Sequence, residues 1–340
     1  MMAMSTALPV IDLRDFSSPA DLAGELLQVG KDPGFFYLVG HGLDDKVADS
    51  IFRLATSFFC CTTQEKQVYA DGSGDLGYTG MREESLSGKG AGDVKESFYL
   101  SDPGDGVQVL PPKLEHGRSE LARFFSACRN ISNMLLQAFA IGLGVPQDFL
   151  SRAHSGESCR MRLLKYPAVE MTPPPESVND DDELQDVRAG AHSDYGSLTL
   201  LFRQPSDQGG LQVLLPDEEQ GGDCWVDVPC LEDAIVVNIG DALEFWTAGR
   251  LRSTVHRVVF PRCARENVAR MSIPVFIQPD RNVMLAPLIR SEDQPKAGRA
   301  PATEEAGFLE VLRRKGYPSA KPVTSHEHLA TRIRATYRGL

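Results

Sequence analysis

The sequence predicts an α+β protein with a mainly β core, a sandwich or jelly roll, flanked by helices at both ends. After Arg160 the chain breaks into short runs rich in β-branched and aromatic residues, separated by turns. Eight or so runs of this kind in little over a hundred residues are typical of such a core. Before and after this region, apolar residues recur at helical spacing. The predicted strands are MRLLKY, LTLLF, GLQVLL, CWVDV, AIVVNIG, ALEFW, TVHRVVF and ARMSIPVFI.

The first third of the chain is predicted to mix strands and helices. LPVIDL (8–13) and GFFYLVG (34–40) are strand candidates, and a helix is expected around 20–29. A second helix is expected after Asp44, where apolar residues form a stripe at helical spacing, and a long one over 119–141.

Two shorter signals lie between these helices. Thr62 and Glu65 fit a capping box, which predicts the start of a short helix. Residues 70–92 carry seven glycines among polar residues, which predicts a mobile loop.

We expect one compact unit with three regions: a mixed N-terminal region (1–159), the β core (160–290) and a C-terminal helical region (291–340). Within the core, TPPPESVNDDDELQD (172–186) is interpreted as a solvated surface insertion. A lid is the alternative, because the insertion leads directly to His192, and the role of its acidic part (176–186) stays open.

Composition excludes several classes of protein. A formal net charge of −12 argues against a nucleic-acid partner, and no apolar run reaches the length of a membrane span. The N-terminus lacks the profile of a signal peptide. Seven cysteines without a Cys-x-x-Cys spacing argue against a disulfide framework or structural zinc, so we expect a cytoplasmic protein. The oligomeric state is not readable.

The stretch GAHSDYGSLTLLF places a histidine and an aspartate beside a predicted strand. If the chain is extended there, His192 and Asp194 point to the same face. They could form a structural pair, a base with its orienting acid, or two ligands of one metal. His256, in a later strand, is a third candidate. Two imidazoles and one carboxylate on one face of a metal are expected of non-haem Fe(II) oxygenases, and they leave sites open for co-substrate and oxygen.

Arg270 and Ser272, in VARMSIPVFI, share a strand face two residues apart. A guanidinium matches a carboxylate in two-pronged fashion, and the hydroxyl adds a hydrogen bond. A dicarboxylate bound there could reach the metal with its other end, as 2-oxoglutarate would. A hairpin turning near Cys263 would set Arg270 across from His256.

This ordered set, His-x-Asp, a distant His and Arg-x-Ser, resembles the isopenicillin N synthase-like branch of the Fe(II)/2-oxoglutarate-dependent dioxygenases. The resemblance extends over nearly the whole chain, and its further segments are DPGFFYLVGHGL, DVKESFYL, LLKYP, VVNIGDALEFW and EHLATRIRATY. It implies a double-stranded β-helix of the cupin-like jelly-roll kind. Tyr166, before Pro167, matches a tyrosine that hydrogen-bonds 2-oxoglutarate in several relatives.

The resemblance implies a dioxygenase that uses Fe(II), 2-oxoglutarate and O₂ to hydroxylate, desaturate or cyclise a small organic molecule, with a hint of specialised metabolism. His192, Asp194 and His256 would bind the iron and carry the catalysis. The alternatives are an oxidase of the same fold that uses no 2-oxoglutarate and, more remotely, a non-catalytic metal-binding jelly roll.

Three residues are candidates for substrate contact. Arg162 alternates with Leu164 and Tyr166 on one strand face, so it could point into the cavity or form a structural salt bridge. Tyr78 and Tyr99 lie near the glycine-rich loop, and loops around a rigid scaffold usually carry specificity. The sequence does not identify the substrate.

Overall fold

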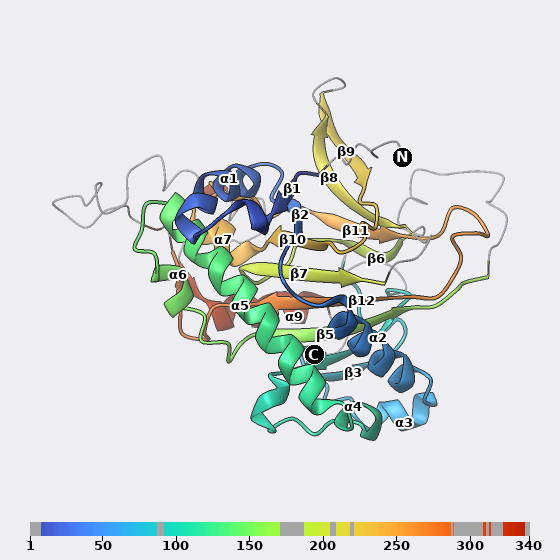
Figure 1. Cartoon of the computed structure of the whole chain (residues 1–340). Coiled ribbons are helices and arrows are strands. Elements are labelled where there is room, and N and C mark those ends of the chain that lie inside the picture. The colour runs from blue at the N-terminus through green and yellow to red at the C-terminus, as the bar shows by residue number, and fades with distance from the viewer. Residues whose placement is uncertain are drawn as a thin grey trace.

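The structure, a computed structural model, describes residues 8–86, 92–170, 187–204, 209–217, 221–286, 288, 309–310, 313 and 322–336. Within these residues two mainly antiparallel β-sheets face each other, and helices cover the outer face of the larger sheet (Figure 1). The predicted α+β class with a mainly β core is confirmed. The acidic segment 176–186 lies outside the described residues, as does most of 291–340.

The larger sheet has eight strands and combines the N-terminal region with the β core. All neighbouring strands are antiparallel except the first pair, which is parallel. In spatial order they are β1 (Val10–Asp12), β2 (Phe35–Val39), β10 (Ile235–Ile239), β7 (Leu198–Arg203), β12 (Arg270–Ile277), β5 (Arg160–Tyr166), β4 (Glu96–Leu100) and β3 (Gly77–Thr79).

The smaller sheet has four antiparallel strands, and its long outer hairpin projects from the body of the molecule (Figure 1). In spatial order they are β6 (Val187–His192), β11 (His256–Val259), β8 (Leu211–Asp217) and β9 (Gly222–Asp227). A third, two-stranded sheet pairs β13 (Met284–Leu285) with β14 (Val323–Thr324).

The alternation of side chains along the large sheet divides the apolar residues into two cores. On β5, Leu163 packs with the helices, whereas Leu164 faces the small sheet. On β2, Phe36 faces the helices, whereas Phe35 and Tyr37 face the small sheet. Since neighbouring residues of a strand point to opposite faces, each strand contributes to both cores. The second core, between the sheets, surrounds the cavity described below.

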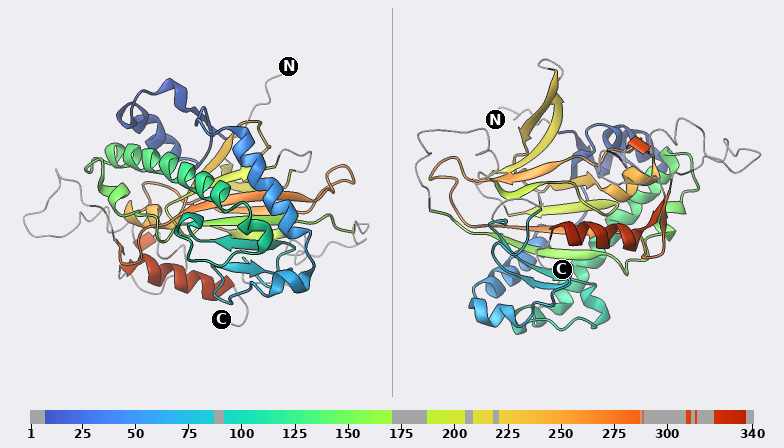
Figure 2. Two further views of the ribbon diagram at one scale, coloured as in Figure 1. Left: turned by 60° about the horizontal axis from the view of Figure 1, so that its bottom comes forward. Right: turned by 180° about the vertical axis from the view of Figure 1, so that it is seen from behind.

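Three helices of the N-terminal region begin at side-chain caps that the sequence encodes. Ser18 caps α1 (Pro19–Lys31), and Asp44 caps α2 (Asp45–Phe59). Thr62 and Glu65 form the predicted capping box of α3 (Thr63–Gln67). The long helix α5 (Arg118–Gly142) crosses the large sheet (Figures 1 and 2). Shorter elements are η1 (Leu13–Asp15), η2 (Pro103–Asp105), α4 (Pro112–Glu115) and α6 (Phe149–Arg152).

The C-terminal helix α9 (Ser325–Thr336) lies on the opposite side of the large sheet from α5 (Figure 2). Thr324 caps it, because its hydroxyl accepts a hydrogen bond from the Glu327 amide while the Glu327 carboxylate accepts one from the Thr324 amide. Leu329 and Ile333 of this helix line the central cavity.

Three expectations need correction. The segment ALEFW is helical, within α7 (Asp241–Trp246), because a short apolar run suits a buried helix as well as a strand. His256 and Arg270 do not share a hairpin, since β11 belongs to the small sheet and β12 to the large one. Residues 260–269 cross between the sheets instead. Within the glycine-rich segment, strand β3 and the buried residue Glu84 belong to the packed structure.

Candidate metal centre and its cavity

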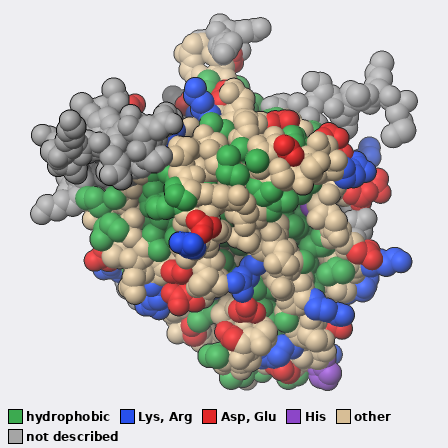
Figure 3. Space-filling view, turned by 60° about the vertical axis from the view of Figure 1, so that its left-hand side comes forward, with side chains coloured by type: hydrophobic (Ala, Val, Ile, Leu, Met, Phe, Trp, Pro, Cys, Tyr) green, Lys and Arg blue, Asp and Glu red, His purple; other side chains and the backbone are tan. Residues whose placement is uncertain are grey.

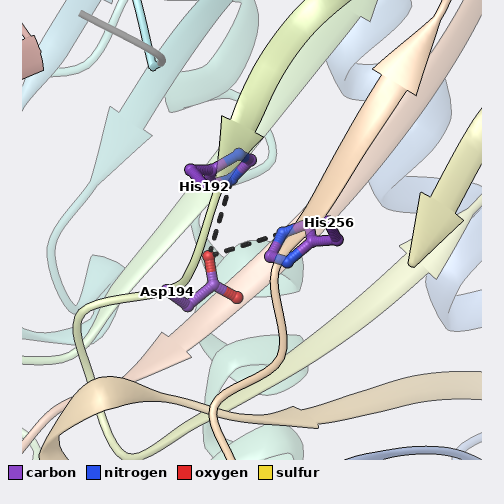
Figure 4. Close-up of side chains that lie close together, drawn as sticks. All are labelled: His192, Asp194 and His256. Carbon is purple, nitrogen blue, oxygen red and sulfur yellow. Dashed lines mark ion pairs between the residues drawn. The ribbon is translucent and has the colours of Figure 1, made fainter. Parts of the chain in front are cut away.

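Two histidines and one aspartate meet at the end of the small sheet (Figure 4). His192 is the last residue of β6, Asp194 follows it, and His256 is the first residue of β11. The Nε2 atoms of both histidines lie 3.9 Å from Asp194 Oδ1, and the ring centroids are 4.2 Å apart. The candidate donor atoms all lie within 4.8 Å of one another. The structure thus brings together the three predicted residues in an arrangement that suits one metal ion.

Backbone carbonyls orient both imidazoles. His192 Nδ1 lies 2.7 Å from the Gly190 carbonyl oxygen, and His256 Nδ1 lies 3.3 Å from that of Thr254. A carbonyl can only accept, so each Nδ1 carries the proton and each Nε2 presents its lone pair toward Asp194. This tautomer is the one that a metal-binding histidine needs.

The Asp194 carboxylate is held through one oxygen and leaves the other toward the histidines. Its Oδ2 accepts hydrogen bonds from Thr199 Oγ1 at 2.6 Å and from Asn238 Nδ2 at 2.7 Å. Sequence reasoning missed both donors. A polar residue inside an apolar strand is the feature that could have indicated them. Asn238 lies in β10, where all five residues are buried, and Thr199 lies in β7.

The backbone around Asp194 is fixed by the start of α7. The Asp241 amide donates to the Asp194 carbonyl at 2.8 Å, and the Ala242 amide donates to the Gly196 carbonyl at 2.9 Å. A Cβ on Gly240 would lie 2.2 Å from the Gly196 oxygen, so only glycine permits this approach. The first amides of a helix lack partners within the helix, and here the loop carrying Asp194 supplies them.

Burial and the charges of the neighbouring groups set the protonation states of His192 and Asp194. Burial and the neighbouring His256 lower the pKa of His192 to about 3, although Asp194 opposes the shift. Burial by itself would raise the pKa of Asp194, but the two histidines and the hydrogen bonds from Thr199 and Asn238 outweigh it and lower that pKa. A neutral His192 and an ionised Asp194 are the protonation states that bind a metal.

The second predicted group, Arg270, Ser272 and Tyr166, lines the same cavity. Arg270 and Tyr166 are paired across β12 and β5, and the guanidinium carbon lies 4.8 Å from the centre of the tyrosine ring. Arg270 is buried, and its Nε has no hydrogen-bond partner among the described residues. Burial, followed by repulsion from Arg203 and Arg188, lowers its pKa to about 10, against the influence of Tyr166. A buried cation of this kind calls for an anion.

Arg203, which sequence reasoning missed, adds a second positive charge to this end of the cavity. It lies opposite Ser272 in the pairing of β7 with β12. Its guanidinium donates to the carbonyls of Val228, at 2.7 Å, and of Pro229. Carbonyls leave the positive charge uncompensated, so Arg203 adds to the attraction that Arg270 exerts on an anion beside it.

A second part of the cavity wall contains buried ion pairs. Arg162 Nη2 lies 2.7 Å from Glu84 Oε2 and 2.8 Å from Ser97 Oγ, and the guanidinium carbon lies 4.3 Å above the Tyr99 ring. Lys95 Nζ lies 2.8 Å from Glu84 Oε2 and pairs with Asp93 as well. Arg162 therefore lines the cavity and forms a salt bridge at once, and Tyr99 lines the cavity too.

Tyr78, the third substrate candidate, does not line the cavity. Its hydroxyl donates to Glu96 at 2.9 Å, and its ring packs edge-on against Phe58 in the core beneath the helices. Tyr78 precedes the loop in sequence, but its strand β3 directs it into this core, so the position overturns the expectation.

Charges of both signs are mixed on the surface. On the face in Figure 3, acidic and basic side chains are interspersed among the residues shown in colour. Nucleic-acid binding calls for a continuous basic surface, and the absence of such a partner stays a prediction. Among the described residues, no helix combines the length and apolar character needed to cross a membrane.

Comparison with known proteins gives consistent matches. Residues 158–279 match the model of the 2OG-Fe(II) oxygenase superfamily, and residues 8–114 match that of the N-terminal region of non-haem dioxygenases in morphine synthesis. A UPF0676 protein of Schizosaccharomyces pombe is 38% identical over 89% of this chain and 90% of its own. The 2-oxoglutarate-dependent dioxygenase traH of Penicillium crustosum is 28% identical over 79% and 83%.

A solved structure agrees over nearly the full length. A full-length Neurospora crassa protein, crystallised in complex with alpha-KG (2-oxoglutarate), is 25% identical, with a TM-score of 0.73 over 96% of each chain. The similarity therefore includes the helical regions before and after the β core as well as the core itself.

Proposed function

The chain belongs to the 2OG-Fe(II) oxygenase superfamily, and on that premise we propose that His192, Asp194 and His256 bind its Fe(II) ion. The enzyme is a non-haem 2-oxoglutarate-dependent dioxygenase that uses Fe(II), 2-oxoglutarate and O₂. The observation that carries the assignment of residues is the convergence of two Nε2 atoms on one carboxylate oxygen, each at 3.9 Å.

The donor set fits the ion. Two neutral imidazoles and one carboxylate suit Fe(II) and leave the remaining positions for co-substrate and oxygen. When bound, the iron supplies the oxidative decarboxylation of 2-oxoglutarate and the oxidation of the substrate. The residues around it keep the donors in place: Thr199 and Asn238 hold the carboxylate, and backbone carbonyls hold the imidazoles.

We propose that Arg270, Ser272 and Tyr166 hold the far carboxylate of 2-oxoglutarate. A planar guanidinium binds a carboxylate through two parallel hydrogen bonds, and the stacked tyrosine ring limits its rotation. Arg203 strengthens the attraction without direct contact. The unpartnered Nε of buried Arg270 supports this role, because a buried cation without an anion costs free energy.

The substrate is a small organic molecule, and we propose that it is oxidised in specialised metabolism by hydroxylation, desaturation or ring formation. We also propose a cytoplasmic location, which the seven free cysteines support. The division at 159/160 and 290/291 is kept as a proposal, although strands from both sides of the first boundary share the large sheet.

Succinate formation from 2-oxoglutarate tests the proposal directly. We expect the purified protein to convert 2-oxoglutarate to succinate only with Fe(II), and Asp194→Ala to lose both this turnover and tight iron binding measured by calorimetry. Wild-type iron affinity in Asp194→Ala would contradict the ligand assignment. Oxidised product without succinate would indicate an oxidase of the same fold.

A further inference from the structure

A second part of the cavity wall contains a network of buried charges that balance. Two acids and two bases are buried there: Glu84, Asp93, Lys95 and Arg162. Glu84 lies between Arg162 at 2.7 Å and Lys95 at 2.8 Å, and Lys95 pairs with Asp93. Glu84, Lys95 and Arg162 line the cavity that also contains the metal centre.

All three cavity-lining members of this network stay charged. Burial by itself would raise the pKa of Glu84, but Arg162 and Lys95 outweigh it and hold that pKa far below its usual range. Burial would lower the pKa of Lys95, but Glu84 and Asp93 outweigh it and raise that pKa. The network is therefore ionic and internally neutralised.

A charged substrate group suits this wall poorly. A carboxylate approaching Arg162 also approaches Glu84, and to bind it the arginine would have to weaken its ion pair with a buried acid, which would keep only Lys95. An ammonium group approaching Glu84 meets Lys95 and Arg162 in the same way. A substrate carboxylate and a substrate ammonium group are therefore each repelled by part of the network.

A neutral amide matches the same wall. Glu84 can only accept hydrogen bonds, whereas Lys95 and Arg162 can only donate them, and the three lie side by side. An amide or imide presents an N–H donor next to a carbonyl acceptor, which complements this pattern without adding charge. Resting on the proposed function, we infer that the substrate carries an uncharged amide- or imide-type group at this wall and that Glu84 excludes carboxylates.

Three probes of one ring skeleton test the inference: benzamide, benzoate and benzylamine. Their binding to the protein loaded with Mn(II) and 2-oxoglutarate would be measured by ligand-observed NMR at millimolar concentration, after calorimetry has verified 2-oxoglutarate binding. We expect wild-type protein to bind benzamide about tenfold or more tightly than either ion. Tighter binding of benzoate, or no binding of benzamide, would overturn the inference.

Charge variants show whether the network selects the substrate or only stabilises the fold. Glu84→Gln leaves two bases against one acid, a net charge of +1, so the preference should reverse toward benzoate. Glu84→Gln combined with Lys95→Met restores neutrality and should restore the preference for benzamide. If Glu84→Gln does not fold, Arg162→Met should instead favour benzylamine. Unchanged preferences in the folded variants would mean that the network is structural.

Asp227→Asn is the matched control, because it removes the acid from a carboxylate–arginine pair, as Glu84→Gln does, but lies on the surface, away from the cavity. It should leave the three affinities within about twofold of wild type. Failure of 2-oxoglutarate to bind would count against the proposed function, whereas normal 2-oxoglutarate binding with a preference for benzoate would count against this inference alone.

Discussion

At the residue scale, the centre depends on side chains that touch the candidate ligands but do not bind the metal. Asp194 carries one carboxylate oxygen toward the histidines because Thr199 and Asn238 occupy the other. Without these donors the carboxylate could rotate and present either oxygen in several directions. Loss of such a supporting group typically lowers metal affinity by about 10- to 100-fold.

Thr199→Val should therefore weaken metal binding although it keeps the shape of the side chain. Loss of the 2.6 Å hydrogen bond to Asp194 is expected to lower Fe(II) affinity by about 10- to 100-fold. Thr199→Ser keeps the hydroxyl and should stay close to wild type. Calorimetric titration with Mn(II) or Fe(II) measures both, and equal affinities in the two variants would count against the role of this hydrogen bond.

Arg270→Lys should raise the apparent Kd for 2-oxoglutarate by about tenfold, because a point charge cannot reproduce the two-pronged contact or the stacking on Tyr166. Arg262→Lys, in an exposed pair with Asp227, changes the same residue type and should have no such effect. Titration of succinate formation against 2-oxoglutarate compares them. An unchanged requirement in Arg270→Lys would place the dicarboxylate elsewhere.

At the element scale, the outer layer is held by close packing between α1 and α5. Gly30 lies under Phe139, and Gly142 lies against the backbone of Ala23, so the two helices approach at glycines. Side chains of ordinary size at these positions would separate the helices and loosen their contact with the large sheet.

Two glycines of α1 should respond in opposite ways to alanine. A Cβ on Gly24 has no atom within 4 Å, so Gly24→Ala should stabilise the protein by about 0.5–1 kcal/mol through the better helix propensity of alanine. A Cβ on Gly30 would lie 2.7 Å from Phe139 Cε1, so Gly30→Ala should cost about 1–3 kcal/mol. Urea denaturation gives both values, and a stabilising Gly30→Ala would show that the contact is not tight.

The sequence predicts the elements well where a local signal exists. The cap residues Ser18, Asp44 and Thr62 act on amides two or three residues away, so their helices can be predicted from the local sequence. ALEFW has no such signal, because a run of its length fits either a helix or a strand. Its conformation is set by the loop of Asp194, some 45 residues earlier in the chain, which accepts its first amides.

Some residues of the candidate site can be predicted from the sequence, and others cannot. Ordered motifs single out His192, Asp194, His256 and Arg270, and the structure places them around one cavity. The role of Glu84 could not be predicted, because its partner Arg162 lies more than 60 residues away and a glutamate in a glycine-rich stretch looks like a solvated residue. Lys95 joins the network only through Glu84 and Asp93. Contacts between neighbouring strands and the segments beside them join distant parts of the chain, so the local pattern does not contain them.

At the scale of the whole molecule, distant segments are joined by polar contacts that depend on protonation. His154, which follows α6, forms a hydrogen bond through each ring nitrogen. Nδ1 lies 2.6 Å from the Leu150 carbonyl oxygen, and Nε2 lies 2.8 Å from Ser197 Oγ. The carbonyl fixes the proton on Nδ1, so the serine donates to Nε2. Burial lowers the pKa of His154 to about 4, although Leu150 and Asp280 oppose the shift.

This shift predicts a loss of stability in mild acid. The unfolded chain takes up a proton at His154 near its ordinary pKa of 6.5, whereas the folded chain does so near 4, so the unfolded state binds more protons between these values. Stability contributed by His154 is therefore complete above pH 6.5 and falls by about 2 kcal/mol by pH 5. In His154→Gln this part of the pH dependence should vanish, whereas in the exposed control His116→Gln it should remain. Denaturation midpoints between pH 5 and 7.5 compare them, and identical profiles would refute the assignment.

The large sheet packs against the N-terminal helices on one face and lines the cavity with the other. Packing and substrate contact therefore fall on different residues. Along β5, Leu163 anchors the architecture while its neighbours Arg162 and Leu164 face the chemistry. Changes at every second position can therefore retune what the pocket accepts without disturbing the layer that keeps the chain folded. Libraries confined to the inward positions of β5 and β12, other than Tyr166, Arg270 and Ser272, should therefore yield many folded variants with altered substrate selectivity.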